Sequence, residues 1–406
     1  MFPAINLFKS KSSTPCYLSL DVGSGSCKAL SFSCVVLEGE SEERKRIKAL
    51  GAGSVSQNSS EMSMGVPADI KAVTNHIGDA VDEATLPLEG LKIKNRILGL
   101  SGEMISFLTT RMRLTRANPD KPISKKEIAR IERKAQQAAF LEAHKELAAR
   151  KGYQDLDLEI VDSAITGVEV DGFPATEPEG FKGEKVELSY FNSFAPQDRL
   201  YTLESILRNL KLKPQLVTAS MYALLHALLE NSPSTGVSSV LIDMGADKTD
   251  VGVVFDSSIV SNRTLPIGGR DFTEAIAHSL EISFSEAEGL KRNYSEDGDD
   301  NARIQSAVAD VLEVWSQGLI DALMNIKEVK AFPPQVNIYG GGAEFKVVLE
   351  HLRSLSWKQN LPFHSDPRVS ILRPEDFDFF EDETGQVSKS DWVVPVVLSW
   401  FGCKVL

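Results

Sequence analysis

Two short stretches of the sequence combine acidic, hydroxyl-bearing and glycine residues in the same order. The first is Asp21-Val22-Gly23-Ser24-Gly25-Ser26-Cys27-Lys28, and the second is Asp243-Met244-Gly245-Ala246-Asp247-Lys248-Thr249-Asp250. Glycine lets the backbone turn sharply and approach a ligand, and the backbone N–H groups of such a turn form a concave anion site. The hydroxyl groups of Ser24, Ser26 and Thr249 add hydrogen-bond donors. The two stretches therefore predict two turns that hold an anionic ligand such as a phosphate.

An aspartate ends the apolar run before each glycine turn. Asp21 follows Tyr17-Leu18-Ser19-Leu20, and Asp243 follows Val240-Leu241-Ile242. An ionised carboxylate only accepts hydrogen bonds, so it suits the water molecules around a divalent cation better than it suits phosphate. Lys28, which closes the first turn, is expected to offset phosphate charge. An exposed aspartate in an ordinary hairpin turn is the alternative for one stretch alone, but two copies favour a site for a metal–polyphosphate complex.

A third glycine cluster lies late in the chain. Gly340-Gly341-Gly342 follows the strand-like run Val336-Asn337-Ile338-Tyr339 and precedes a helical pattern from Ala343 to Leu355. A strand, a glycine turn and a helix N-terminus place backbone N–H groups and a positive dipole end beside a ligand. The triple glycine is a weak signal alone, but it supports the interpretation of the two turns.

The elements that must position these residues predict one unit that occurs twice. Apolar runs flank the first turn at residues 17–20 and 29–36, and they flank the second at residues 240–242 and 251–255. The pattern predicts strand, tight turn and strand in two copies. Two such turns facing each other would hold a polyphosphate from both sides.

The composition indicates a globular protein and excludes several classes of function. The 406 residues carry a net charge of −13, which argues against non-specific nucleic-acid binding because that needs a basic surface. The six histidines and four cysteines show no metal-ligand spacing, and reduced thiols in a cytosolic protein are the simplest expectation. No apolar run approaches the roughly 20 residues of a membrane span, and the N-terminus shows no signal-peptide pattern.

In this order, the three glycine signals resemble the phosphate-1, phosphate-2 and adenosine loops of the actin-like ATPase superfamily. Two further stretches resemble bacterial FtsA, the cell-division actin homologue, and its relative PilM from type IV pilus assembly. These stretches are Leu265 to Phe272 and Ile97 to Gly102. The resemblance spans most of the chain. It implies an α/β, actin-like fold (a duplicated ribonuclease H-like fold) with a central nucleotide cleft and an inserted small αβ subdomain of SHS2-like type.

The resemblance also implies a division of the chain. We expect an N-terminal tail (1–15), a first actin-like half (16–87 and 175–235), the inserted subdomain (88–174), a second half (236–265 and 333–406) and a mainly helical subdomain of that half (266–332). The apolar and basic tail is typical either of a segment that touches a membrane or partner, or of a loosely packed end.

ATP and Mg²⁺ are the ligands that the resemblance implies. The residues expected to bind them are Asp21, Gly23, Ser24, Gly25, Ser26, Lys28, Asp243, Gly245, Ala246, Asp247, Lys248, Thr249, Asp250, Glu288, Lys291, Gly340, Gly341 and Gly342. Asp21 and Asp243 would bind the metal through water. Glu288 and Lys291 resemble the side chains that touch ribose and adenine, and the alternative is an i,i+3 surface pair. The resemblance supplies no residue that orients the attacking water, so we expect a slow ATPase at most.

Two positions depart from the family pattern. Cys27 stands where a small hydroxyl or aliphatic residue is more common, and Asp247-Lys248 stands where actin-like loops often read Gly-Thr or Gly-Gly. The Asp247 carboxylate disfavours tight triphosphate binding unless Lys248 or Mg²⁺ compensates. The Ala-Asp-Lys-Thr run of this loop is closer to the PilM pattern.

Three functions fit the resemblance. The first is an FtsA-type protein that self-assembles into filaments or dimers and links a tubulin-like division ring to the membrane. The second is a PilM-like adaptor that binds a cytoplasmic peptide of an inner-membrane pilus protein, depending on its nucleotide. The third is a sugar or acid kinase, which the short first loop and the lack of a clear aspartate base disfavour. We expect a cytoplasmic protein, with peripheral contact at the inner face of the cell membrane left open, and no nucleic-acid partner.

Overall fold

The computed structural model describes residues 15–406 except 38–43, 64, 152–156, 176, 233–235, 296–297, 328, 355 and 360. The expected N-terminal tail lies almost wholly outside the described residues, and so do residues 233–235, which end the expected first half.

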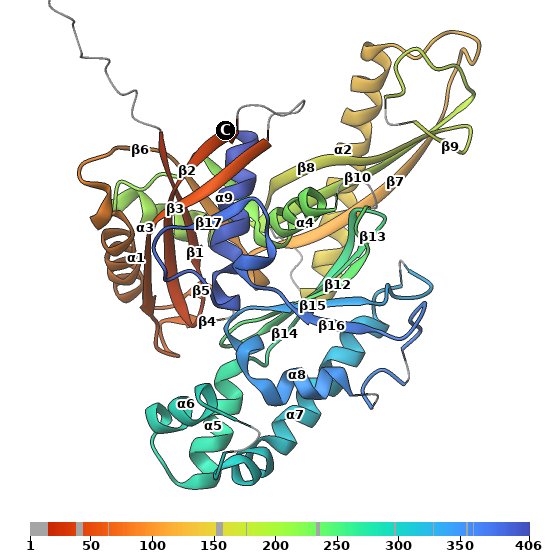
Figure 1. The fold of residues 1–406 in the computed structure, drawn as a ribbon. Helices are drawn as coiled ribbons and strands as arrows, with labels where there is room; N and C mark the ends of the chain where they lie inside the picture. Colours follow the sequence, from red (N-terminus) through yellow and green to blue (C-terminus); the bar gives the residue numbers. More distant parts are fainter. Residues whose placement is uncertain are drawn as a thin grey trace, which may run out of the picture.

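Two mixed sheets form the body of the molecule and repeat one topology (Figure 1). The first contains, in spatial order, β11 (Leu216–Ala219), β6 (Ile93–Leu100), β1 (Cys16–Val22), β2 (Ser26–Leu37), β3 (Arg44–Ser56) and β17 (Phe380–Asp382). The second contains β14 (Ser258–Leu265), β13 (Thr249–Phe255), β12 (Ser239–Met244), β15 (Gln335–Tyr339) and β16 (Arg368–Ile371). In each sheet an antiparallel three-strand meander carries two parallel strands on the outer side of its first strand. This repeat confirms the predicted duplicated α/β fold.

The first strand of each repeat is buried on both faces. In β12 the run Val240–Ile242 is fully buried, and so are Leu18 and Leu20 in β1. Consecutive apolar residues favour strands that are covered on both sides. Ser19 between them is also buried, and its hydroxyl donates to Pro395 O at 2.9 Å. This packing fixes the strand ends that carry the two aspartates.

The helices and remaining short elements cover these sheets. Helices of the first half are α1 (Ile70–Thr85), α3 (Gln197–Asn209) and α4 (Ser220–Asn231), with a short strand pair β4 (Met62–Ser63) and β5 (Val66–Pro67). In the described part of the chain, no helix combines the length and apolarity that crossing a membrane requires.

A third sheet forms a separate lobe, whose strands lie in the chain between β6 and β11 of the first sheet. Its strands, in spatial order, are β7 (Ser106–Thr115), β10 (Lys185–Pro196), β8 (Leu158–Val170) and β9 (Phe173–Pro174), and α2 (Lys125–Lys151) packs on it. We expected residues 175–235 to return to the first half, but β10 pairs with β7 and β8 along its length. Val186 and Leu188 of β10 belong to the core of this lobe. The strand pattern that ends at Val170 therefore marks a turn within the lobe, and its SHS2-like character stays a prediction.

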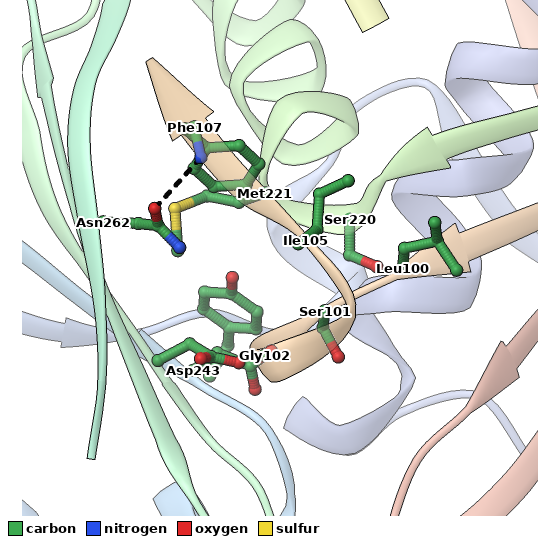
Figure 2. A pocket seen from close by; sticks show the side chains of 11 residues that line it. Leu100, Ser101, Gly102, Ile105, Phe107, Ser220, Met221, Asp243 and Asn262 are labelled. Carbon is green, nitrogen blue, oxygen red and sulfur yellow. Dashed lines mark hydrogen bonds between the residues drawn. The ribbon is translucent and has the colours of Figure 1, made fainter. Parts of the chain in front are cut away.

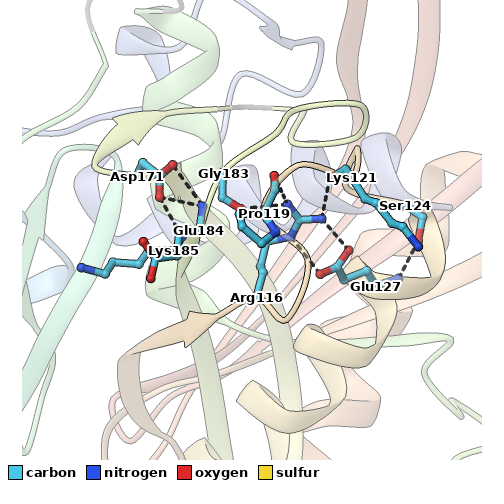
Figure 3. Close-up of polar contacts among 9 residues, drawn as sticks. All are labelled: Arg116, Pro119, Lys121, Ser124, Glu127, Asp171, Gly183, Glu184 and Lys185. Carbon is cyan, nitrogen blue, oxygen red and sulfur yellow. Dashed lines mark hydrogen bonds and ion pairs between the residues drawn. The ribbon is translucent and has the colours of Figure 1, made fainter.

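A buried arginine fixes the loop between β7 and α2 (Figure 3). The side chain of Arg116 is 3% exposed and forms two bonds with Glu127, Nε to Oε1 at 2.9 Å and Nη2 to Oε2 at 3.0 Å. It also donates to Gly183 O and Lys121 O, each at 2.9 Å. Hydrogen bonds from Arg116 hold the pKa of the Glu127 carboxyl below its usual value. A bidentate pair of this kind gives the lobe a fixed outer end.

The helical subdomain lies below the second sheet (Figure 1). It contains α5 (Gly269–Leu280), α6 (Phe284–Arg292) and α7 (Asn301–Met324), where helical patterns were predicted, and α8 (Lys346–Arg353) follows β15. The apolar stripe of α7 is buried at Ile304, Val308, Trp315, Leu319 and Leu323. Trp315 Nε1 donates to Thr249 Oγ1 at 2.9 Å, which ties α7 to the strand after the second turn.

Two elements late in the chain cross back to the first half, although we expected residues 333–406 to belong to the second. β17 pairs in parallel with β3, and α9 (Val393–Val405) packs on β1, β2 and β6. Because Val393 to Cys403 are all buried, α9 has no single apolar face that would select a sheet. Near its end, Cys403 forms a disulfide with Cys34 of β2, with 6.0 Å between the Cα atoms, where we expected reduced thiols. These two cysteines meet only through the fold.

Candidate functional site

The two predicted turns have the same backbone geometry. The N–H of Gly23 donates to Ser26 O at 3.1 Å, and the N–H of Gly245 donates to Lys248 O at 2.9 Å. Each turn joins the first two strands of its repeat, β1 to β2 and β12 to β13. The sequence pattern thus gave rise to one local structure in both halves.

Folding brings the two turns into direct contact. A Cβ placed on Gly25 would lie 2.9 Å from the Cβ of Ala246, so only a glycine fits at this position without a shift. The N–H of Asp247 donates to Ser24 Oγ at 3.4 Å across the same boundary. The predicted facing arrangement is present, and a phosphate group between the turns would require them to separate.

Backbone donors in both turns are available to an anion. Among the described residues, the N–H groups of Ser24 and Gly25 donate to no protein group, and the same holds for Ala246. The carbonyl groups of the first turn are in contrast engaged: Gln57 N–H donates to Gly25 O at 3.0 Å, and Gln57 Nε2 donates to Gly23 O. A turn with free amides and satisfied carbonyls suits phosphate oxygens.

Three cations line the turns, and each is paired with a carboxylate. The pairs are Lys28 with Asp391 at 3.3 Å, Lys248 with Asp250 at 2.9 Å, and Arg270 with Asp247. The side chains of the three cations are between 7% and 12% exposed. Lys28 Nζ also donates to Ser26 Oγ at 2.6 Å, and Lys248 Nζ donates to Ser101 Oγ at 3.3 Å. The positive charge of the site is therefore already balanced by protein carboxylates.

Asp21 and Asp243 have no partner of this kind. Neither side chain makes a hydrogen bond or ion pair with the described residues, although both backbones pair with neighbouring strands. Burial, with the charges of Asp250 and Asp21 nearby, raises the pKa of Asp243 to about 8. Burial likewise raises the pKa of Asp21, although Lys28 and Lys248 counteract it. No group of three or more metal-ligating side chains occurs in the described part of the chain.

The third glycine cluster packs directly on Asp243. Gly340 has φ +93°, and a Cβ there would lie 2.7 Å from Asp243 Oδ1 and 2.6 Å from Met244 O. We expected a helix from Ala343, but a short 3-10 turn (η3, Gly341–Glu344) comes first and α8 starts only at Lys346. The cluster contributes close backbone approach, and a full helix N-terminus does not point at the site.

Glu288 and Lys291 lie under the start of α5 and beside the third cluster. Lys291 is 9% exposed, so it does not belong to a surface pair. Its Nζ lies 2.7 Å from Glu288 Oε2 and donates to Gly269 O at 2.7 Å and Thr273 Oγ1 at 2.6 Å. A Cβ on Gly269 would lie 3.5 Å from the Cα of Gly342, which brings the expected adenosine residues together. Their polar atoms already have protein partners.

Residues that sequence reasoning missed complete the site. Arg270 pairs with Asp247, and its Nη2 donates to Ser24 O at 3.3 Å and Gln57 O at 3.2 Å. Asp391 faces Lys28 from the turn before α9. Arg270 lies in the stretch Leu265 to Phe272, which the sequence singled out, whereas Asp391 carried no sequence signal.

A small cavity lies behind the second turn (Figure 2). Asp243, Asp250, Tyr339, Ser101 and Gly102 are among its lining residues. Its size admits about one water molecule. A phosphate group is larger than this cavity.

Comparison with known proteins finds similarity to two groups, one in sequence and one in fold. A sequence model of the family described as cell division protein FtsA matches residues 240–374, which contain the second turn and the third glycine cluster. FtsA of Streptococcus pneumoniae is 25% identical over 281 residues, or 69% of this chain and 56% of that protein. FtsA of Bacillus subtilis is 25% identical over 278 residues, or 68% of this chain and 57% of that protein. The chain thus spans less than two thirds of the length of these relatives.

Among solved structures, one of a PilM–PilN type IV pilus biogenesis complex contains a similar fold. The TM-score is 0.65 at 18% sequence identity, and the match covers 95% of this chain and 98% of that chain.

Proposed function

We propose that this chain, whose sequence is similar to FtsA proteins and whose fold is similar to that in a PilM–PilN complex, binds ATP with Mg²⁺ between its two glycine turns. The observation that supports this most strongly is the meeting of the two turns, one from each repeat, with free amide donors and two unpaired aspartates.

Different residues of the cleft would bind the phosphates and the metal. The amides of Ser24, Gly25 and Ala246 would bind phosphate oxygens, and Lys28 would offset their charge. Asp21 and Asp243 would accept hydrogen bonds from the water molecules around Mg²⁺, whose charge would favour the ionised form of both carboxyl groups. When bound, the metal supplies the positive charge that stabilises phosphoryl transfer. Since the site has no identified residue that orients a water molecule, any hydrolysis is slow and serves as a timer.

The adenosine end would lie between α6 and the third glycine cluster. Gly340 and Gly342 pack closely on Met244 of the second turn, so this cluster would offer its backbone to the base and the sugar. Glu288 and Lys291 form the opposite wall. Both must exchange present partners for the ribose and the adenine.

We propose an FtsA-type role for the whole protein. It self-assembles, and its nucleotide state controls the link between a tubulin-like division protein and the inner face of the cell membrane. The relatives in sequence, all named cell division protein FtsA, support this role.

A PilM-like adaptor is the second candidate. The fold match to the PilM–PilN complex extends over 95% of the chain, and the Asp247-Lys248 loop resembles the PilM pattern. The partner would then be a short cytoplasmic peptide of a membrane-anchored pilus protein.

Thermal unfolding tests the nucleotide site. Mg-ATP at 100 times its Kd should stabilise the protein by about 2.7 kcal/mol and raise Tm accordingly. Asp243→Asn should abolish this shift, while Asp300→Asn, which removes one charge from an exposed pair with Arg303, should retain it. A Tm that saturating Mg-ATP leaves unchanged contradicts the proposal.

A pull-down separates the two roles. The immobilised chain with Mg-ATP is offered the C-terminal tail of a tubulin-like division protein or the N-terminal peptide of a pilus membrane protein. Capture of the first peptide alone supports the FtsA-type role, and capture of the second alone supports the adaptor.

A further inference from the structure

Arg270 connects the two halves at the point where the turns meet. It is the second residue of α5, and the start of α5 is bound to the second turn: Gly269 N–H donates to Gly245 O at 2.9 Å, and Arg270 N–H donates to Ala246 O at 2.8 Å. The backbone of Arg270 therefore moves with the second half. Its guanidinium reaches into the first half.

The guanidinium binds carbonyl groups of the first half. Arg270 Nη2 donates to Ser24 O at 3.3 Å, in the first turn, and to Gln57 O at 3.2 Å, just after β3. These bonds close the mouth of the cleft together with the bond from Asp247 N–H to Ser24 Oγ. They must break when the turns separate.

The carboxylate of Asp247 orients the guanidinium of Arg270. Its Oδ1 pairs with Arg270 Nη1, and the two side chains are 17% and 12% exposed, so water screens the pair little. Both residues belong to the second half, so the pair itself survives separation of the turns. A carboxylate and a phosphate present the same kind of anionic oxygen to arginine, in planar two-point contacts.

We propose that Asp247 and Arg270 form a strap that competes with polyphosphate for the cleft. Asp247 orients Arg270 towards the carbonyl groups of the first half. When a nucleotide enters, its phosphate oxygens replace Asp247 as the partner of Arg270. Arg270 is thus a phosphate-binding residue of the open cleft, and Asp247 is a positioning residue that weakens nucleotide binding. This inference rests on the proposed nucleotide site.

The strap predicts opposite effects of two substitutions that both remove the same ion pair. Asp247→Asn frees Arg270 and removes a negative charge that faces the phosphates, so Mg-ATP should bind at least about tenfold tighter. Arg270→Ala removes a phosphate ligand and leaves Asp247 unpaired, so Mg-ATP should bind at least about tenfold more weakly. A merely structural ion pair would shift both affinities in the same direction.

The experiment measures two quantities on the full chain. Isothermal titration with Mg-ATP gives the affinity, and hydrogen exchange without nucleotide gives the protection of peptides that contain residues 20–28 and 243–250. Both variants should exchange faster in these peptides than wild type and than Asp300→Asn, which carries the same charge change as Asp247→Asn. Asp247→Ser repeats the first test if the asparagine variant folds poorly.

The outcomes separate the strap from the site. Affinity that is unchanged or weaker in Asp247→Asn, or tighter in Arg270→Ala, overturns the strap while the nucleotide site stands. If wild type and every variant fail to bind Mg-ATP, the proposed function fails. In that case hydrogen exchange still tests whether the strap closes the turns. Unchanged protection of residues 20–28 and 243–250 in both variants rules the strap out.

Discussion

At the scale of single residues, Asp243 combines a functional position with a cost to stability. Its pKa is raised from 3.8 to about 8, chiefly by burial. Because the pKa of Asp243 is raised in the folded state, its ionisation costs no stability below about pH 4. The free energy of unfolding then falls as the pH rises from about 4 towards about 8. Asp243→Asn removes this loss. In urea unfolding, the variant should be about 1–3 kcal/mol more stable than wild type at pH 9 and equal to it near pH 4.

Asp250→Asn provides the matched control for this prediction. Asp250 is paired, since Lys248 Nζ lies 2.9 Å from its Oδ2 and Thr264 Oγ1 donates to its Oδ1 at 2.6 Å. Removal of its charge leaves Lys248 buried without its partner, so stability should fall by about 3 kcal/mol. Lower stability of Asp243→Asn at pH 9 would mean that Asp243 has a stabilising partner.

Residue types and spacing predicted where the two turns lie in the chain better than they predicted which side chains contact each other there. The two turns could be found because glycine, hydroxyl and aspartate residues follow a buried strand in the same order twice. The pairs of Lys28 with Asp391 and of Arg270 with the carbonyl of Ser24 could not be found, because these residues lie far apart in sequence and meet only after folding. For the same reason the closed contact between the turns was not foreseen.

At the scale of elements, the placement of α5 depends on one glycine. A Cβ on Gly268 would lie 2.3 Å from Ala246 O, so a side chain there pushes α5 away from the second turn. Gly268→Ala should therefore cost about 2–3 kcal/mol of stability. It should also weaken the Tm shift with Mg-ATP, because Arg270 moves with the helix.

Gly289→Ala tests the same change where space is free. Gly289 lies inside α6, and no heavy atom lies within 4 Å of an added Cβ. Alanine stabilises a helix interior relative to glycine, so urea unfolding should show a gain of about 0.5–1 kcal/mol. Equal effects of the two substitutions would contradict the tight approach of α5.

The starts of two helices are set by local contacts. Ser124 accepts a hydrogen bond from Glu127 N–H at 3.3 Å, and Ser283 forms a reciprocal capping box with Glu286. The membership of β10 could not be predicted, because strand pairing is decided by distant partners. An alternating strand pattern fits either sheet equally well.

At the scale of the whole molecule, the disulfide between Cys34 and Cys403 joins positions 369 residues apart. A cross-link over such a loop restricts the unfolded chain, which typically stabilises a protein by about 2–4 kcal/mol. Reduction should lower the midpoint of urea unfolding by a corresponding amount. Cys34→Ser should unfold at the same midpoint with and without reductant.

Thiol counting checks this assignment. Cys16 and Cys27 are free and buried, so the denatured protein should alkylate at two cysteines before reduction and at four after it. Cys16→Ser should keep its response to the reductant. Four reactive thiols in unreduced, denatured protein would contradict the bond.

The duplicated architecture could be predicted because each repeat contains the same glycine turn after its first strand. The sequence could not show which half β17 and α9 join. Helix α9 is apolar on all sides, and β17 has only three residues. Their place is set by the surface that remains uncovered, which is a property of the assembled fold.

That late return of the chain bears on how the protein is made. While residues 393–405 are still inside the ribosome, the strand that carries Asp21 has emerged with one face bare, because α9 is its cover. The second sheet, whose strands end at Ile371, can assemble before α9 is made, so the sheet that is synthesised first is covered after the second one is complete. A nascent chain therefore exposes this apolar face until α9 is available to cover it.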